Sequence, residues 1–144
     1  MDTFTLPWLP NSVLGTWIAR RRARVAATKL NLQLFEKRLE LFDAARAFLS
    51  GIVRKETVTH EEIDTYRSDV ADAAIVFDEK TASYLESTRM KAAQLLLVQG
   101  QLADARHMAH EERAKLIDME VRVRSEFIDE LKTLVGRFRP FLKV

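Results

Sequence analysis

The fold is decided by the stretch LNLQLFEKRLELFDAARAFLSGI, which occupies residues 30–52. Its apolar residues recur at spacings of three, four or seven: Leu30, Leu34, Leu41, Ala45, Phe48 and Ile52. This repeat predicts a wide apolar stripe along a helix. Because residues 13–53 contain no proline, we predict one long first helix over that range. Asn11 or Ser12 can cap its start, and Gly51 is a stop signal near its end.

Three more helices are predicted downstream from the same periodicity and from capping signals. The segment from Thr59 to Glu62 has the pattern of a capping box, and Asp78 is a second N-cap candidate. Gly136 and Pro140 are stop signals. We therefore expect helices at residues 60–76, 79–107 and 111–136. The apolar tail, residues 138–142, is expected to dock on them.

No segment alternates apolar and polar residues with period two, so no strand is predicted. The fold class we predict is all-α, an antiparallel bundle of about four helices with a long, protruding first helix. The chain has 144 residues, enough for one domain or one domain with a tail. Only four glycines and three prolines occur, too few for an all-β sandwich or a glycine-loop nucleotide fold.

The chain has no cysteine, which excludes disulfides, thiol nucleophiles and thiolate metal sites. Its charge is distributed unevenly. Residues 1–55 carry ten lysines and arginines against four acidic residues, whereas the remainder carries thirteen bases and seventeen acids. This asymmetry indicates that the N-terminal end contacts an anionic surface, such as lipid, nucleic acid or an acidic protein.

The N-terminal segment is the strongest functional signal. Residues 3–19 contain no charge, both tryptophans and two of the three prolines. The run is too short and too interrupted by proline to span a bilayer, and its basic residues follow it, unlike those of a signal peptide. We expect an interfacial membrane anchor, because tryptophan favours the headgroup zone and arginine pairs with anionic lipid. Its contact residues would be Leu6, Trp8, Leu9, Leu14, Trp17, Ile18, Arg20, Arg21, Arg22 and Arg24.

The sequence of this segment is also consistent with other interpretations. It could dock on a protein partner or fold back on the bundle, and its arginines could contact nucleic acid phosphates. Nucleic acid is the less favoured partner, because no aromatic residues are interleaved with the bases and the rest of the chain is acidic. Residues 13–33 of the first helix are expected to project past the bundle and could pair with another copy, so self-association is also predicted.

Catalytic and metal-binding motifs are scarce. The only candidate metal ligands are His107 and His110, three residues apart and followed by Glu111. They match neither the Glu-x-x-His pairs of di-iron bundles nor the His-Glu-x-x-His order of zinc proteases. No glycine-rich phosphate loop occurs. We therefore predict a protein that is not an enzyme and needs no metal or cofactor.

Several ordered blocks resemble a widespread group of uncharacterised bacterial proteins. The blocks are Phe35–Leu49, Val58–Glu62, Asp72–Phe77, Tyr84–Leu85 and Phe138–Leu142, and the resemblance covers about residues 30–142. In that group an N-terminal membrane helix and a basic stretch precede a small cytosolic helical domain. The resemblance implies no activity. This chain departs from the group's plan at its N-terminus, where the apolar run is short and contains prolines.

These observations predict an anchor segment at residues 1–24 and a helical bundle domain at residues 25–144. The predicted function is that of a non-enzymatic interaction or scaffold protein, peripheral at the cytoplasmic face of a bacterial inner membrane. The alternatives are a soluble accessory subunit that docks through its N-terminal segment and a helical protein that binds nucleic acid through its arginines.

Overall fold

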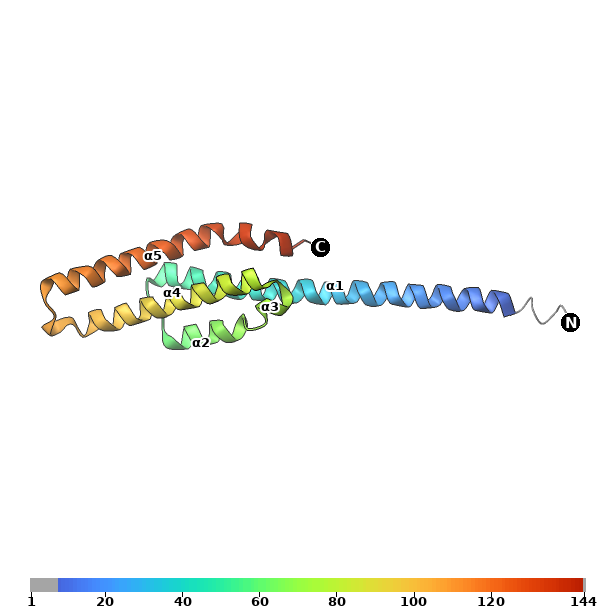
Figure 1. Cartoon of the computed structure of the whole chain (residues 1–144), viewed down its shortest axis with the longest axis horizontal. Coiled ribbons are helices and arrows are strands. Elements are labelled where there is room, and N and C mark those ends of the chain that lie inside the picture. The colour runs from blue at the N-terminus through green and yellow to red at the C-terminus, as the bar shows by residue number, and fades with distance from the viewer. Residues whose placement is uncertain (1–7, 144) are drawn as a thin grey trace. The chain divides into compact units, whose positions relative to one another are not determined.

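The computed structural model describes the backbone of residues 8–143 and the side chains of residues 14–143. Helices are the only regular elements in this range (Figure 1). They are α1 (Trp8–Lys55), α2 (His60–Asp69), α3 (Ala73–Val76), α4 (Glu79–Ala103) and α5 (His110–Phe138), with short 3₁₀ turns η2 (Ala105–His107) and η3 (Arg139–Phe141). The all-α class and the long first helix, 48 residues, are confirmed.

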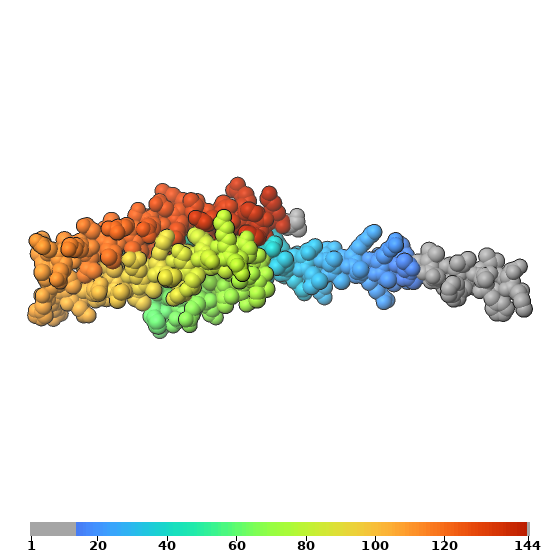
Figure 2. All heavy atoms as spheres, viewed as in Figure 1, coloured from blue at the N-terminus to red at the C-terminus, as the bar shows by residue number. Residues whose placement is uncertain are grey.

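The chain divides into two compact units. Residues up to Glu36 form the first, and Lys37–Lys143 form the second, which we call the helical domain. Within the helical domain, α5 returns along α4 after the η2 turn, and α2 and α3 pack on α4 (Figure 1). Figure 2 shows α4 and α5, yellow and orange, as one continuous surface.

The core of the helical domain draws on α1, α2, α3, α4 and α5. Its buried apolar residues include Leu41, Ala45, Phe48, Leu49, Ile52, Ile63, Tyr66, Leu85, Ala92, Leu95, Val123, Phe127, Leu134 and Phe138. The predicted stripe on the first helix is therefore correct from Leu41 onward. Leu30 and Leu34, which have the same spacing, are 65% and 36% exposed. Helical periodicity shows that a face is apolar, but burial also needs a facing element.

Both ends of α1 differ from the prediction. The helix begins at Trp8, so Asn11 and Ser12 lie inside it and are not its caps. Pro10 falls in the first turn, where the backbone N–H groups have no partner within the helix and proline is tolerated. At the other end, the helix continues past Gly51 to Lys55.

The turn after α1 is held by a non-glycine residue in a left-handed conformation. Glu56 has φ 61°, and its N–H donates to the Ile52 carbonyl at 2.7 Å. Left-handed backbone at this position normally favours glycine. Two side chains from other helices hold Glu56 in place. The Gln99 amide donates to its carbonyl at 3.0 Å, and the Arg124 guanidinium pairs with its carboxylate at 2.8 Å.

The predicted caps are confirmed, whereas three predicted helices differ in extent. The helix expected over residues 79–107 ends at Ala103. The Thr59 hydroxyl accepts from the Glu62 N–H at 3.1 Å, and the Asp78 carboxylate accepts from the Thr81 N–H at 2.7 Å. The helix expected over residues 60–76 is broken between α2 and α3. At the C-terminal end, α5 continues through Gly136 to Phe138.

The docking of the C-terminal tail is confirmed. Phe138 is fully buried, and its ring lies 5.5 Å from that of Phe42 and 5.1 Å from that of Phe77, measured between centroids. Phe141 also contacts Phe77, at 5.1 Å in an edge-to-face arrangement. Such aromatic pairs stabilise a core beyond the area they bury. The tail therefore closes one end of the helical domain.

The two capping carboxylates make the stability of the helical domain depend on pH. Lys55 and Thr59 lower the pKa of Glu62 below 4.5, and Thr81 lowers the pKa of Asp78 below 3.8. The unfolded chain therefore binds more protons in acid, and the contribution of these groups is lost as pH falls through their folded pKa values. We expect a lower melting temperature at pH 3 than at pH 6 by circular dichroism.

Glu62→Gln should reduce this pH dependence. The matched control is Glu61→Gln, because Glu61 is an exposed neighbour with no ion pair in the described part of the chain. Equal pH dependence in the two variants would contradict the assignment to Glu62.

Candidate functional site

The N-terminal surface lies on α1 between Leu14 and Leu34, where every side chain is exposed. Residues separated by four or seven positions share one face of a helix. Leu14, Ile18, Val25 and Leu32 follow that spacing, and Trp17 lies beside them. We call these five residues the α1 stripe. They give the first unit a line of exposed apolar side chains along one helix face.

Basic residues border the α1 stripe on both edges. At 100° per residue, Arg20 and Arg24 lie along one edge, and Arg22 and Lys29 lie along the other. Arg21 falls within the stripe, and its guanidinium lies 5.4 Å from the centroid of the Trp17 ring, a cation–π distance. Residues 3–35 contain these five bases and no acidic residue. The surface therefore combines an apolar face with positive charge that no acidic neighbour in sequence neutralises.

The structure places seven of the ten predicted contact residues on this segment of α1: Leu14, Trp17, Ile18, Arg20, Arg21, Arg22 and Arg24. Trp8 and Leu9 belong to α1, but their side chains lie outside the described residues, as does all of Leu6. Sequence reasoning missed Val25, Lys29 and Leu32. The spacing from Leu14 and the absence of acidic residues up to Phe35 were the signals that could have found them.

Over the residues that the structure describes, no helix combines the length and the apolar character needed to cross a bilayer.

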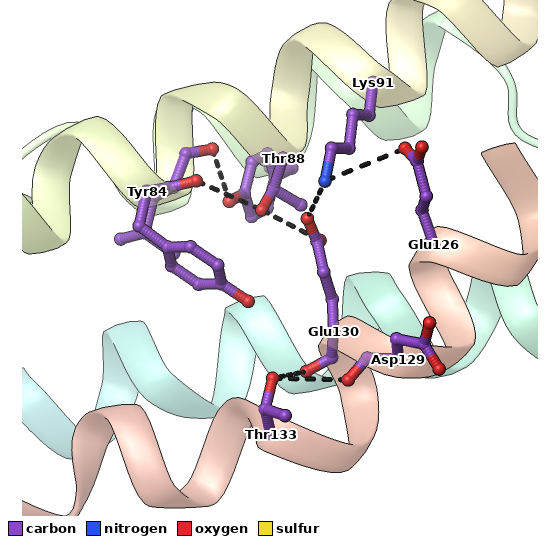
Figure 3. Close-up of polar contacts among 9 residues, drawn as sticks. Tyr84, Thr88, Lys91, Glu126, Asp129, Glu130 and Thr133 are labelled. Atoms are coloured by element: carbon purple, nitrogen blue, oxygen red, sulfur yellow. Dashed lines mark hydrogen bonds and ion pairs between the residues drawn. The ribbon is translucent and has the colours of Figure 1, made fainter.

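A second group of polar side chains links α4 to α5 inside the helical domain (Figure 3). Glu130 is only 9% exposed. Its carboxylate accepts from the Thr88 hydroxyl at 3.2 Å and from Lys91 at 2.6 Å. Lys91 also lies 3.8 Å from Glu126. Both carboxylate oxygens of Glu130 therefore accept hydrogen bonds, and the Lys91 ammonium balances its charge. These contacts link α4 to α5.

Tyr84 lies beside this group with its hydroxyl buried and without a hydrogen-bond partner among the described residues. The Arg137 guanidinium covers its ring at 4.3 Å from the centroid. Burial raises the pKa of the Tyr84 hydroxyl, and the nearby Glu130 carboxylate adds to that shift. A phenol with a raised pKa stays protonated at neutral pH.

Comparisons of the chain with protein-family models, curated proteins and solved structures gave no match.

The candidate metal ligands do not share a helix face. His107 ends the η2 turn, whereas His110 begins α5, and Met108 between them has extended backbone. The chain turns between the two histidines, at the break between the helices expected at residues 79–107 and 111–136. In residues 8–143 no three histidine, aspartate or glutamate side chains are grouped to hold a metal ion.

Proposed function

We propose that this protein is a non-enzymatic helical interaction protein that binds an anionic lipid surface through its N-terminal unit. The observation that carries the proposal is the exposed α1 stripe with basic residues along both edges. On this view the helical domain, Lys37–Lys143, is held at the membrane and is available for contacts with other proteins. The cytoplasmic leaflet of a bacterial membrane is the proposed location, since its anionic lipid attracts basic segments.

The arrangement matches what an interfacial helix needs. An apolar stripe enters the boundary between headgroups and acyl chains, and long basic side chains on its edges reach back to the phosphates. Each base near such a surface contributes about 1 kcal/mol. The five bases between Arg20 and Lys29 therefore supply on the order of 5 kcal/mol, in addition to the burial of Leu14, Ile18 and Val25.

Two alternative occupants fit this surface less well. Pairing with the same segment of a second copy would oppose five bases with five bases, and residues 3–35 have no acid to offset the repulsion. A nucleic acid would accept the bases, but its phosphates would leave Leu14, Ile18 and Val25 in water. An anionic membrane is the one of these partners that uses both the apolar and the basic residues.

Vesicle flotation tests the proposal with the full chain. We expect flotation with phosphatidylcholine vesicles that contain phosphatidylglycerol, and weaker flotation with phosphatidylcholine alone. Neutralising the edges with Arg20→Gln, Arg22→Gln and Arg24→Gln should weaken the anionic partition constant by more than about tenfold. The control is Arg106→Gln, Arg113→Gln and Lys115→Gln, which removes the same charge from exposed residues with no ion pair in the described part.

A second variant separates the apolar part from the charge. Leu14→Ser, Ile18→Ser and Val25→Ser should abolish the flotation that persists in high salt, because phosphate contacts weaken with salt and apolar burial does not. Flotation that the two triple variants leave unchanged would contradict the proposal. Failure of the unmodified chain to float would favour docking on a protein, and salt-sensitive DNA binding without flotation would favour nucleic acid.

A further inference from the structure

A second exposed apolar stripe runs along α5 in the helical domain. Ile117, Val121, Ile128 and Val135 are 45%, 51%, 41% and 47% exposed, and their spacings of four and seven place them on one helix face. We call these four residues the α5 stripe. The neighbouring face of α5, roughly a third of a turn away at 100° per residue, already supplies the core, through Val123, Phe127 and Leu134 among others. The helix is therefore apolar on two sides, and one of them faces water.

A groove lies at the middle of the α5 stripe. It has a volume of about 260 Å³ and runs beside Ser125. Val121 and Ile128 form its α5 wall, and Ile52 and Val53 of α1 form the other. The Arg124 guanidinium, paired with Glu56 at 2.8 Å, borders it. A small residue at the centre of the groove lets another helix approach closely.

One pair of opposite charges on α5 is placed symmetrically about Ser125. Asp118 lies seven residues before it and Lys132 seven residues after it, and both are exposed. Neither has an ion-pair or hydrogen-bond partner among the described residues. The small residues Ala114 and Gly136 are likewise equidistant from Ser125, at eleven positions. A helix with this pattern is complementary to itself when a second copy runs in the opposite direction.

We propose that a second copy of this chain covers the α5 stripe, with the two α5 helices antiparallel about a two-fold axis at Ser125. A two-fold axis brings together residues that lie on opposite sides of it at similar distances. It therefore places Val121 against the partner's Ile128, and Asp118 against the partner's Lys132. Parallel pairing in register would oppose Asp118 with the partner's Asp118, which like charges disfavour.

This interface goes beyond the proposed lipid contact and does not rest on it, because it uses only the helical domain. The two would act together, since a dimer carries two copies of the basic N-terminal surface. Linked binding sites strengthen attachment without any new contact, provided both can engage.

Charge exchange tests the interface by analytical ultracentrifugation of the full chain without lipid. The unmodified protein should sediment at twice the chain mass of 16.6 kDa. Asp118→Lys and Lys132→Asp should each weaken the dimer by at least tenfold. Either change alone makes the side chains at positions 118 and 132 alike in charge, and the two-fold axis brings these positions together twice. The double variant, Asp118→Lys with Lys132→Asp, should restore it. The control is Asp69→Lys, which reverses an exposed charge on α2.

Circular dichroism checks that each variant is folded, and Asp118→Asn with Lys132→Gln replaces any variant that is not. A monomer across the micromolar range would overturn the proposal. A dimer that survives both single reversals would also overturn it. A dimer weakened by the single changes but not restored by the double change would refute the antiparallel register.

Discussion

Replacing Phe138 with alanine is expected to destabilise the helical domain by about 3–5 kcal/mol. The ring is fully buried and contacts Phe42 and Phe77, so its loss leaves a cavity and removes two aromatic contacts. Urea unfolding followed by circular dichroism measures the effect. The midpoint should fall while the dependence of the unfolding free energy on urea stays unchanged, which indicates an unaltered unfolded state.

The control for this change is Ile75→Ala, because Ile75 is apolar but 82% exposed. Its effect should stay within about 0.5 kcal/mol. A loss below about 1 kcal/mol for Phe138→Ala would show that the C-terminal tail is not part of the core.

Replacing Lys91 with methionine is expected to cost about 2–3 kcal/mol, because it leaves the carboxylate of Glu130 buried and without its cation. The estimate is below the range for fully buried pairs, since 30% of the Lys91 side chain is exposed. Glu130→Leu should cost less, because the freed lysine can reach water. The double variant, Lys91→Met with Glu130→Leu, should be close to neutral.

Urea unfolding of the four proteins forms a double-mutant cycle. Lys115→Met is the matched control for Lys91, since Lys115 is exposed on α5 and makes no ion pair in the described residues. Additive effects of the two changes at Lys91 and Glu130 would mean that these side chains do not stabilise each other.

Local signals in the sequence predicted much of the fold. Thr59 and Asp78 cap their helices as expected, because a cap depends only on the next three residues. The stripe from Leu41 to Ile52 and the docked ring of Phe138 were also correct, since long apolar runs in a small domain are normally covered.

Features that depend on distant partners were not predictable in this way. Glu130 resembles a solvated acid in the sequence, and its burial requires Lys91, 39 positions away on another helix. Leu30 and Leu41 have the same spacing pattern, yet only Leu41 is covered, so spacing alone does not distinguish them. Likewise, no glycine or proline marks the break at residues 70–72. After the break, α3 ends at Val76, whose carbonyl accepts from the Arg38 guanidinium at 2.6 Å.

The same division applies to the candidate surfaces. The arginines and Trp17 were identified because composition alone distinguishes them. Lys29 and Val25 were missed, although their spacing from Leu14 on the predicted helix could have placed them on the same surface. Ile117 and Val121 have helical spacing, which alone does not decide whether a side chain is buried, and both are exposed.

The side chains from Leu14 to Leu34 are all exposed, and this has a thermodynamic consequence. Their helix is held by backbone hydrogen bonds and intrinsic propensity, so it can open locally without disturbing the core. Any partner that requires this segment to be helical must offset the conformational entropy of ordering it. The strength of attachment then depends on helix stability in the free protein. Glycine inside a helix lowers its stability relative to alanine. At Gly15 an added Cβ would meet no atom within 4 Å, so packing does not require a glycine there. Gly15 therefore weakens the free helix, and with it any attachment that needs the helical form.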